Sequence, residues 1–177
     1  STIVHRRVDG AVDNPRSREA LERTPKTAQR LAALDEEAVR DVLLFVLNAN
    51  WRGQAVGEMF SGSGKTDISI MAGGRRLFMA ELKWWDGPKA LAEAVDQLSG
   101  YLVARETAAC LVILYKGGNF TSVADKAHAA LLDHSAIVGC LSPLSAAGGS
   151  GRHWLKSATD CTRRLELVII LVDLSVR

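Results

Sequence analysis

The sequence predicts an α/β fold in which a mixed central sheet is flanked by helices on both faces. Two observations lead to this class. Residues 54–85 read as three consecutive strands joined by short turns, and residues 109–115 form a short, wholly apolar run. Such a run is typical of a central strand that is buried on both faces. Because segments of helical period precede, separate and follow these strands, helices are expected on both sides of the sheet.

The first predicted element is a helix that begins after Asp35. An aspartate is a good N-cap, and the carboxylates of Glu36 and Glu37 favour the positive first turn of a helix. Apolar residues then recur at helical spacing, and the pattern ends near residues 48–50. These apolar positions are Val39, Val42, Leu43 and Val46.

Three strands are expected next, over residues 54–60, 67–71 and 77–85. The second is rich in β-branched residues, and the third is apolar with two charges set into it. The residues Ala72-Gly73-Gly74-Arg75 separate the second strand from the third. Glycines supply the positive φ that tight turns require, so these two strands are predicted to form a hairpin.

Two helices are predicted in the second half of the chain. Asp86-Gly87-Pro88 is a capping residue followed by a proline near the first helical position, which starts a helix. One apolar stripe follows it as far as Leu102. The second helix covers residues 121–134, where Ser122 and Asp125 have the spacing of a capping box.

The chain is predicted to end in a closing hairpin. Residues 145–151 are small and glycine-rich, which indicates a mobile loop. Strands follow near residues 153–157 and 164–174. The last of these offers an edge at which a homodimer can form by strand pairing.

Composition places the chain among ordinary globular proteins. Its 177 residues, 47% hydrophobic and 24% charged, suit one domain, and a net charge of +2 does not by itself indicate nucleic acid. Residues 1–32 are arginine-rich and have no sustained period, so they are interpreted as a basic linker or N-terminal extension. Residues 33–177 are expected to form the domain. The longest apolar run, residues 165–171, is too short for a membrane span.

Cysteines and histidines give no metal motif. Cys110, Cys140 and Cys161 are far apart and form no CxxC pair, which favours small buried apolar residues in a reducing, cytoplasmic setting. The histidines share no spacing with one another or with the carboxylates, so no histidine metal site is expected. They are His5, His128, His134 and His153.

A phosphate-loop interpretation of Gly62-Ser63-Gly64-Lys65-Thr66 is rejected. That motif needs a glycine where Met59 stands, and it needs a helix immediately after the Lys-Thr pair. The strand-like Asp67-Ile68-Ser69-Ile70 follows instead.

The chemistry is predicted at Asp67, Glu81 and Lys83. Side chains alternate across a strand, so Glu81 and Lys83 point to the same side. Hairpin pairing brings Asp67, at the start of the preceding strand, close to both. Buried charges of this kind are costly unless they are paired or bound to a metal, so two readings stay open: a structural acid–lysine cluster, or a magnesium or manganese site completed by the Leu82 carbonyl.

A resemblance bears on this choice. Thirteen residues separate Asp67 from Glu81-Leu82-Lys83, and the set resembles the PD-(D/E)XK nuclease superfamily. The αβββαβ order of residues 35–115 is similar to the restriction-endonuclease-like core. In place of the proline that often precedes the aspartate stands Thr66. Gln97 and Tyr101, one helical turn apart, are similar to the Q-x-x-x-Y element of RecB-type members.

The resemblance implies roles for further residues. Asp67, Glu81 and the Leu82 carbonyl would hold Mg²⁺, for which Mn²⁺ can substitute, and Lys83 would position the attacking water. Gln97 would help to shape the catalytic site, while Tyr101 would contact the substrate. An additional upstream acid is expected at Glu58, and Lys65 is expected to contact a phosphate, with a solvated loop lysine as the alternative.

The implied activity is a magnesium-dependent deoxyribonuclease, specifically an endonuclease, with RNA as the other substrate to test. The resemblance also suggests an effector domain of an anti-phage defence protein, controlled by an upstream sensor or regulatory domain. The competing hypothesis is a catalytically inactive nuclease-like fold that binds nucleic acid or protein. Neither hypothesis includes a membrane.

Overall fold

The computed structural model describes residues 24–51, 55–61, 64–72, 75–101, 108–158, 160 and 162–175. Four helices are described in these ranges. They are α3 (Pro25–Ala32), α4 (Glu36–Trp51), α5 (Pro88–Tyr101) and α6 (Phe120–Asp133). The strands are β1 (Ala55–Ser61), β2 (Gly64–Ala72), β3 (Arg75–Trp84), β4 (Ala108–Tyr115), β5 (Ile137–Ser142), β6 (Ser150–Lys156) and β7 (Arg164–Asp173).

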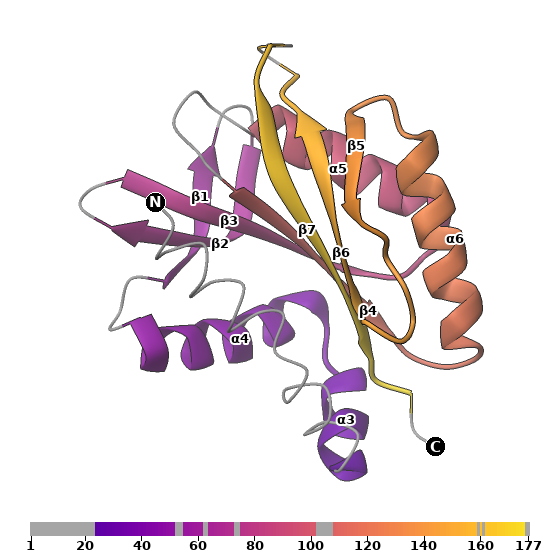
Figure 1. Cartoon of the computed structure of the whole chain (residues 1–177). Coiled ribbons are helices and arrows are strands. Elements are labelled where there is room, and N and C mark those ends of the chain that lie inside the picture. Colours follow the sequence, from indigo (N-terminus) through magenta and orange to yellow (C-terminus); the bar gives the residue numbers. More distant parts are fainter. Residues whose placement is uncertain are drawn as a thin grey trace.

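The described strands form one mixed sheet of seven strands in the order β1-β2-β3-β4-β7-β6-β5 (Figure 1). β1, β2 and β3 are a consecutive antiparallel meander. β4 lies parallel to both β3 and β7, and the sheet closes with the antiparallel strands β6 and β5. The prediction of a mixed α/β sheet is therefore confirmed.

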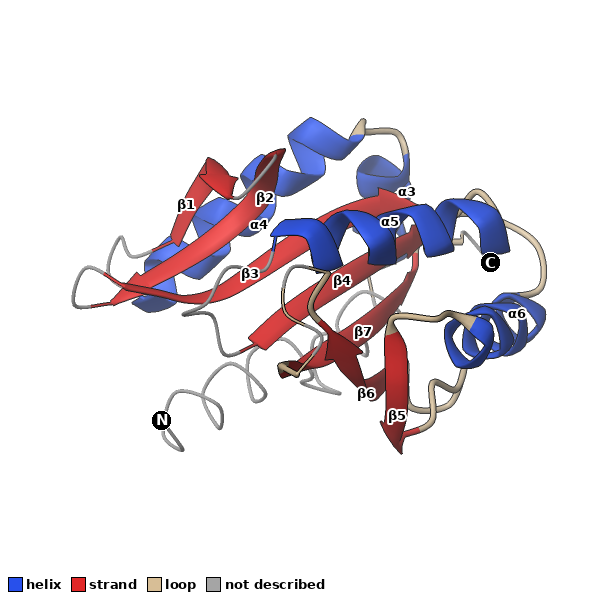
Figure 2. Cartoon of the chain, turned by 90° about the horizontal axis from the view of Figure 1, so that it is seen from above, coloured by secondary structure: helices blue, strands red, loops and turns tan. Residues whose placement is uncertain are grey.

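Helices cover both faces of the sheet (Figure 2). On one face, α5 and α6 pack on alternate residues of the central strands, including Met79, Leu111 and Ile169. On the other face, α3 and α4 pack on the residues between them, including Leu82 and Val112. β4 is buried along nearly its whole length, as its apolar sequence predicts.

Local sequence accounts for the elements that precede the site. Asp35 caps α4, since its Oδ1 accepts the Ala38 N–H at 2.8 Å and its carbonyl accepts the Val39 N–H at 3.1 Å. The predicted hairpin also forms, because Ala72 pairs with Arg75 and Ile68 with Ala80 across β2 and β3. The turn residues 73 and 74 themselves lie outside the described ranges.

The start of α6 differs from the prediction. Its N-cap is Asn119, whose side chain accepts the Ser122 N–H at 3.1 Å, so the expected capping box at Ser122 and Asp125 is wrong. An asparagine oxygen serves this purpose as well as a serine hydroxyl. The cap lies three residues further upstream because α6 begins with the buried Phe120.

The structure of the closing region differs from the prediction in three ways. β6 and β7 pair as predicted, but β7 lies between β4 and β6 and offers no free edge for a dimer. An additional strand, β5, pairs with β6 on its other side. The predicted mobile loop of residues 145–151 is a turn closed by a 2.8 Å bond from the Gly149 N–H to the Ser145 carbonyl, and Ser150 begins β6.

Gly151 shows why this part of the chain contains glycine. A Cβ on Gly151 would lie 2.7 Å from the Leu144 backbone, so only glycine lets β6 approach residue 144 so closely.

The N-terminal prediction is only partly covered by the structure. Residues 1–23 lie outside the described ranges, and α3 begins at Pro25. Ala28 of α3 is buried against the α4 face of the sheet, so packing begins before residue 33. The division between residues 32 and 33 stays a prediction. None of the described helices is long and apolar enough to cross a membrane.

Candidate active site

The predicted acid–lysine set assembles where β2 separates from β3. The described pairing of these strands runs from the hairpin turn to the Ile68–Ala80 pair. Asp67 and Glu81 are next in register and share one face of the sheet, since directly opposed residues in antiparallel strands do so. Met79, two residues before Glu81, packs with α5, which places this face beneath that helix.

Asp67 takes the place of a strand partner for β3. Its Oδ2 accepts the Leu82 N–H at 2.8 Å, a bond that β2 no longer supplies after the strands part. In a strand, the N–H and C=O of one residue point to the same neighbour. The Leu82 carbonyl is therefore directed toward the edge at which the Asp67 carboxylate lies.

Lys83 is held between two carboxylates. Its Nζ lies 3.2 Å from Glu81 Oε1 and 3.2 Å from Glu36 Oε1. Glu81 is almost fully buried, whereas Glu36 and Lys83 are partly exposed. The lysine thus bridges an interior carboxylate and one that faces the opening between β2 and β3.

Glu36 is a site residue that sequence reasoning missed. Besides pairing with Lys83, its Oε2 accepts the Trp84 N–H at 3.2 Å. Two successive N–H groups of β3 that face the departing strand, at Leu82 and Trp84, are therefore capped by Asp67 and Glu36. The sequence predicts Glu36 only as a favourable first-turn glutamate of α4. Its position at the start of a helix, where it can face the end of a strand, is the one sign of a role in the site.

The carboxylates carry an electrostatic cost. The pKa of Glu81 is raised to about 7, because burial and then the nearby Asp67 charge raise it by more than Lys83 lowers it. Glu81 Oε2 is buried and has no hydrogen-bond partner among the described residues. A carboxylate in this state is unusual for a purely structural group, because buried polar atoms are normally satisfied.

The pKa values of Asp67 and Lys83 are both raised, but for different reasons. Burial raises the pKa of Asp67, although the Leu82 N–H and Lys83 counteract it. Burial alone would lower the pKa of Lys83, but Glu81 and Glu36 raise it above its ordinary value. The two carboxylates consequently favour the protonated form of Lys83.

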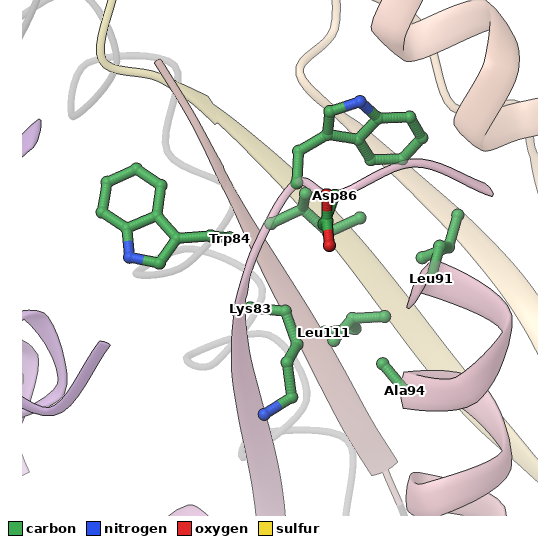
Figure 3. Close-up of a pocket in the computed structure, with 8 residues that line it drawn as sticks. Lys83, Trp84, Asp86, Leu91, Ala94 and Leu111 are labelled. Atoms are coloured by element: carbon green, nitrogen blue, oxygen red, sulfur yellow. The ribbon is translucent and has the colours of Figure 1, made fainter. Parts of the chain in front are cut away.

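A small hollow opens beside the lysine at the end of β3. It is lined by Lys83, Trp85, Asp86 and the α5 residues Leu91 and Ala94, among others, and its volume of about 10 Å³ admits roughly one water molecule. Figure 3 shows Trp84 pointing to the opposite side of β3 from Leu91 and Ala94. On that side, the Trp84 ring packs under the Lys116 ammonium at 4.4 Å.

The other predicted site residues are placed less completely. Gln97 is half-buried on α5, the helix above the face that carries Glu81. Tyr101 is the last residue of α5, and its side chain lies outside the described part of the structure, as do those of Glu58 and Lys65. The register places position 58 between the pairs Gly57–Ile68 and Met59–Thr66, across from Asp67.

The donor set can be tested for a hard cation. Asp67, Glu81 and the Leu82 carbonyl offer oxygen atoms, which magnesium prefers, and the unpartnered Glu81 Oε2 is an available ligand. As the side chains stand, no group of three or more His, Cys, Asp or Glu residues in the described ranges is arranged to hold a metal ion. The chemistry of these donors would suit an ion held by two carboxylates and a carbonyl, with water in the remaining positions.

Comparison of the chain with known protein families, with curated proteins and with solved structures found no match.

Proposed function

We propose that this protein is a metal-dependent nuclease built on a restriction-endonuclease-like core. The observation that carries the proposal is the convergence of Asp67, Glu81 and Lys83 at the point where β2 leaves β3. Two carboxylates and a lysine in one partly buried group are costly to keep unless they act together on a charged ligand.

The arrangement of elements supports the proposed core. α4, β1, β2, β3, α5 and β4 follow one another in the αβββαβ order, with the aspartate on the second strand and the E-x-K residues on the third. Fold order alone does not define an activity, so the argument depends on the site residues.

Asp67, Glu81 and the Leu82 carbonyl would hold the ion, for which Mg²⁺ is the first choice and Mn²⁺ a substitute. When bound, such an ion supplies a nucleophile at neutral pH and neutralises charge on the phosphate. The high pKa of Glu81 means that its proton must leave when a cation binds, so ion affinity rises with pH.

Lys83 acts in this proposal as a fixed positive charge. Its raised pKa, caused by Glu81 and Glu36, favours the protonated form that this role requires. A protonated lysine next to the cleaved phosphate stabilises the negative charge that develops on the transferred group. Glu36 and Glu81 hold its Nζ in place from two sides.

The alternative is a catalytically inactive fold that binds nucleic acid or protein. One observation favours it: Lys83 is already paired with two carboxylates, which satisfies the lysine without a ligand. The unpartnered Glu81 Oε2 favours the nuclease, because a structural cluster gains nothing from a buried carboxylate oxygen without a donor.

The test is cleavage of supercoiled plasmid DNA and of RNA by the full chain in Mg²⁺, Mn²⁺ or EDTA. The proposal predicts metal-dependent nicking of the plasmid, which also identifies an endonuclease. Glu81→Ala is expected to abolish it, and Lys83→Ala is expected to lower it by about 100- to 1,000-fold. Lys89→Ala, which removes a lysine exposed on α5, is the matched control and retains activity.

Equal cleavage by the wild type and both site variants would contradict the proposal, since the activity would then come from elsewhere or from a contaminant. Nucleic-acid binding with no cleavage in any metal would support the binding module instead. Faster cleavage of RNA than of the plasmid would support the same catalytic site but would make RNA the substrate.

A further inference from the structure

A second group of unsatisfied polar atoms lies far from the acid–lysine site in sequence. Among the described residues, buried side-chain nitrogen and oxygen atoms without a hydrogen-bond partner occur at Glu81 Oε2, His128 Nδ1 and both ring nitrogens of His153. The two imidazoles belong to one place, because their ring centroids are 6.1 Å apart. Buried polar atoms left in this state require an explanation, such as a bound ion or water.

Both histidines are held by packed elements. His128 lies on α6 and is half-buried, whereas His153 lies on β6 and has no exposed surface. β6 is paired with β5 on one side and with β7 on the other, so the backbone that carries His153 is held within the sheet. The pair therefore sits between a helix and a strand that are otherwise joined by apolar packing.

Burial favours the form of His153 that binds metal. Burial and, to a smaller extent, the nearby His128 together lower the pKa of His153 to about 4. At neutral pH His153 is therefore uncharged, as a ligating imidazole must be. Imidazole nitrogen suits zinc, copper and nickel and is a poor ligand for magnesium, so this chemistry differs from that of the carboxylate site.

A third donor lies on the neighbouring strand. Cys140 of β5 is directly paired with His153 in the ladder, and it is a free, exposed thiol. Directly opposed residues of antiparallel strands have Cβ atoms only about 5 Å apart and share one face. The three side chains are not arranged as a metal group as they stand in the described structure, so the thiol must rotate about its χ1 bond to join the imidazoles.

The spacing of the rings admits one ion. Two bonds of about 2.0–2.1 Å from nitrogen to zinc, together with the two ring radii, set the ring centroids roughly 6.4 Å apart when the bonds are collinear and roughly 5 Å apart at the tetrahedral angle. The observed 6.1 Å separation lies between these two values. The rings must therefore approach each other by about 1 Å for a tetrahedral ion to bind both.

We propose that His128, His153 and Cys140 form a binding site for a borderline divalent transition metal such as Zn²⁺, which ties α6 to β6 and the edge strand β5. The thiol loses its proton to solvent when the metal binds, and water completes the coordination. This site is independent of the proposed nuclease activity, and its role is structural.

The experiment uses the full chain carrying Glu81→Gln, which removes the buried carboxylate that would also bind zinc. Metal-free protein is titrated with Zn²⁺ by calorimetry, and the histidine ring nitrogens are followed by ¹⁵N NMR. One Zn²⁺ per chain is expected, with shifts of the His128 and His153 rings and a higher unfolding temperature. Adding His128→Ala should weaken binding by more than about tenfold, since even the loss of an outer-shell partner costs this much.

Two further variants keep the test decisive. His134→Ala removes a nearby histidine that pairs with Asp96 instead, and it should leave zinc binding unchanged. Cys140→Ser should abolish the thiolate-to-metal charge-transfer band of the Co²⁺ form without unfolding the protein, because Cys140 is exposed. Zinc binding that survives His128→Ala, or ring nitrogens that do not respond to Zn²⁺, would overturn the proposal and leave a bridging water between the rings.

Discussion

The acid–lysine site between β2 and β3 and the imidazole pair between α6 and β6 bury titratable groups of opposite kinds. In the first, burial raises the pKa of Glu81 to about 7, and in the second it lowers the pKa of His153 to about 4. Both shifts have the same cause, since burial penalises whichever form is charged. The fold thus favours the neutral form of both groups.

The two regions consequently oppose each other as pH changes. The folded-state pKa of Glu81 exceeds its ordinary 4.5, so its contribution to stability is complete below pH 4.5 and is lost as the pH rises through 7. For His153 the folded-state pKa lies below 6.5, so its contribution is complete above pH 6.5 and is lost as the pH falls through 4. Each site therefore destabilises the folded protein when its titratable group is charged and has no partner.

The largest expected effect concerns the lysine that distinguishes the acidic site. Lys83→Ala is predicted to lower metal-dependent plasmid nicking by about 100- to 1,000-fold, which is the usual cost of removing one group that stabilises transition-state charge. Initial nicking rates measure it. A variant with nearly wild-type rates would show that the lysine serves only to pair the carboxylates.

The imidazole pair is predicted to make the metal-free protein sensitive to acid. Between pH 6.5 and 4, His153 takes up a proton in the unfolded state but stays neutral in the folded state, where it is buried. This difference lowers the free energy of unfolding by about 3 kcal/mol over the full range. Denaturant unfolding in EDTA across this range measures the slope. His153→Leu should flatten it, and an unchanged slope in that variant would assign the acid sensitivity to other groups.

Glu36 is predicted to be a positioning residue with a smaller effect. Glu36→Gln keeps an oxygen for the Trp84 N–H but removes the charge beside Lys83, so nicking should fall by about tenfold and the lysine pKa should decrease. Nicking rates and the ¹⁵N titration of the Lys83 ammonium measure the two effects.

Glu37→Gln is the matched control for this residue. Glu37 lies on the same turn but is exposed and pairs with Arg40, so its loss should change neither quantity. Equal effects of the two substitutions would mean that the overall charge of α4, and not the contact with Lys83, determines the rate.

Sequence reasoning predicted those features that depend on local pattern. The cap at Asp35, the β2–β3 hairpin and the buried strand β4 follow from residues close together in the chain, and strand parity placed Glu81 and Lys83 on one face. The β2–β3 hairpin brings Asp67 near them, but the pairing of Ala72 with Arg75 at the turn would by itself set Asp67 opposite Ala80. A register shift between Ile70 and Met71, which the sequence does not indicate, sets it opposite Glu81.

Features that depend on contacts distant in sequence were not predictable in this way. Glu36 meets Lys83 across 47 positions, and the histidines of the second site come from a helix and a strand with no common spacing. β5 was missed because its six residues include Gly139 and are mostly exposed or half-buried, which gives no strand-like alternation of apolar residues. Cys140, expected to be buried, is exposed on this edge strand.

The most direct test of the central claim measures stability and activity in one variant, Glu81→Gln. At pH 8 in EDTA this variant should be more stable than the wild type by about 1–3 kcal/mol, because the substitution removes a buried charge. At pH 5 the gain in stability should disappear. In Mg²⁺ the same variant should no longer nick plasmid DNA. A variant that is destabilised at pH 8 and still cleaves would contradict the account, since Glu81 would then be a structural ion-pair partner and not a ligand kept for function.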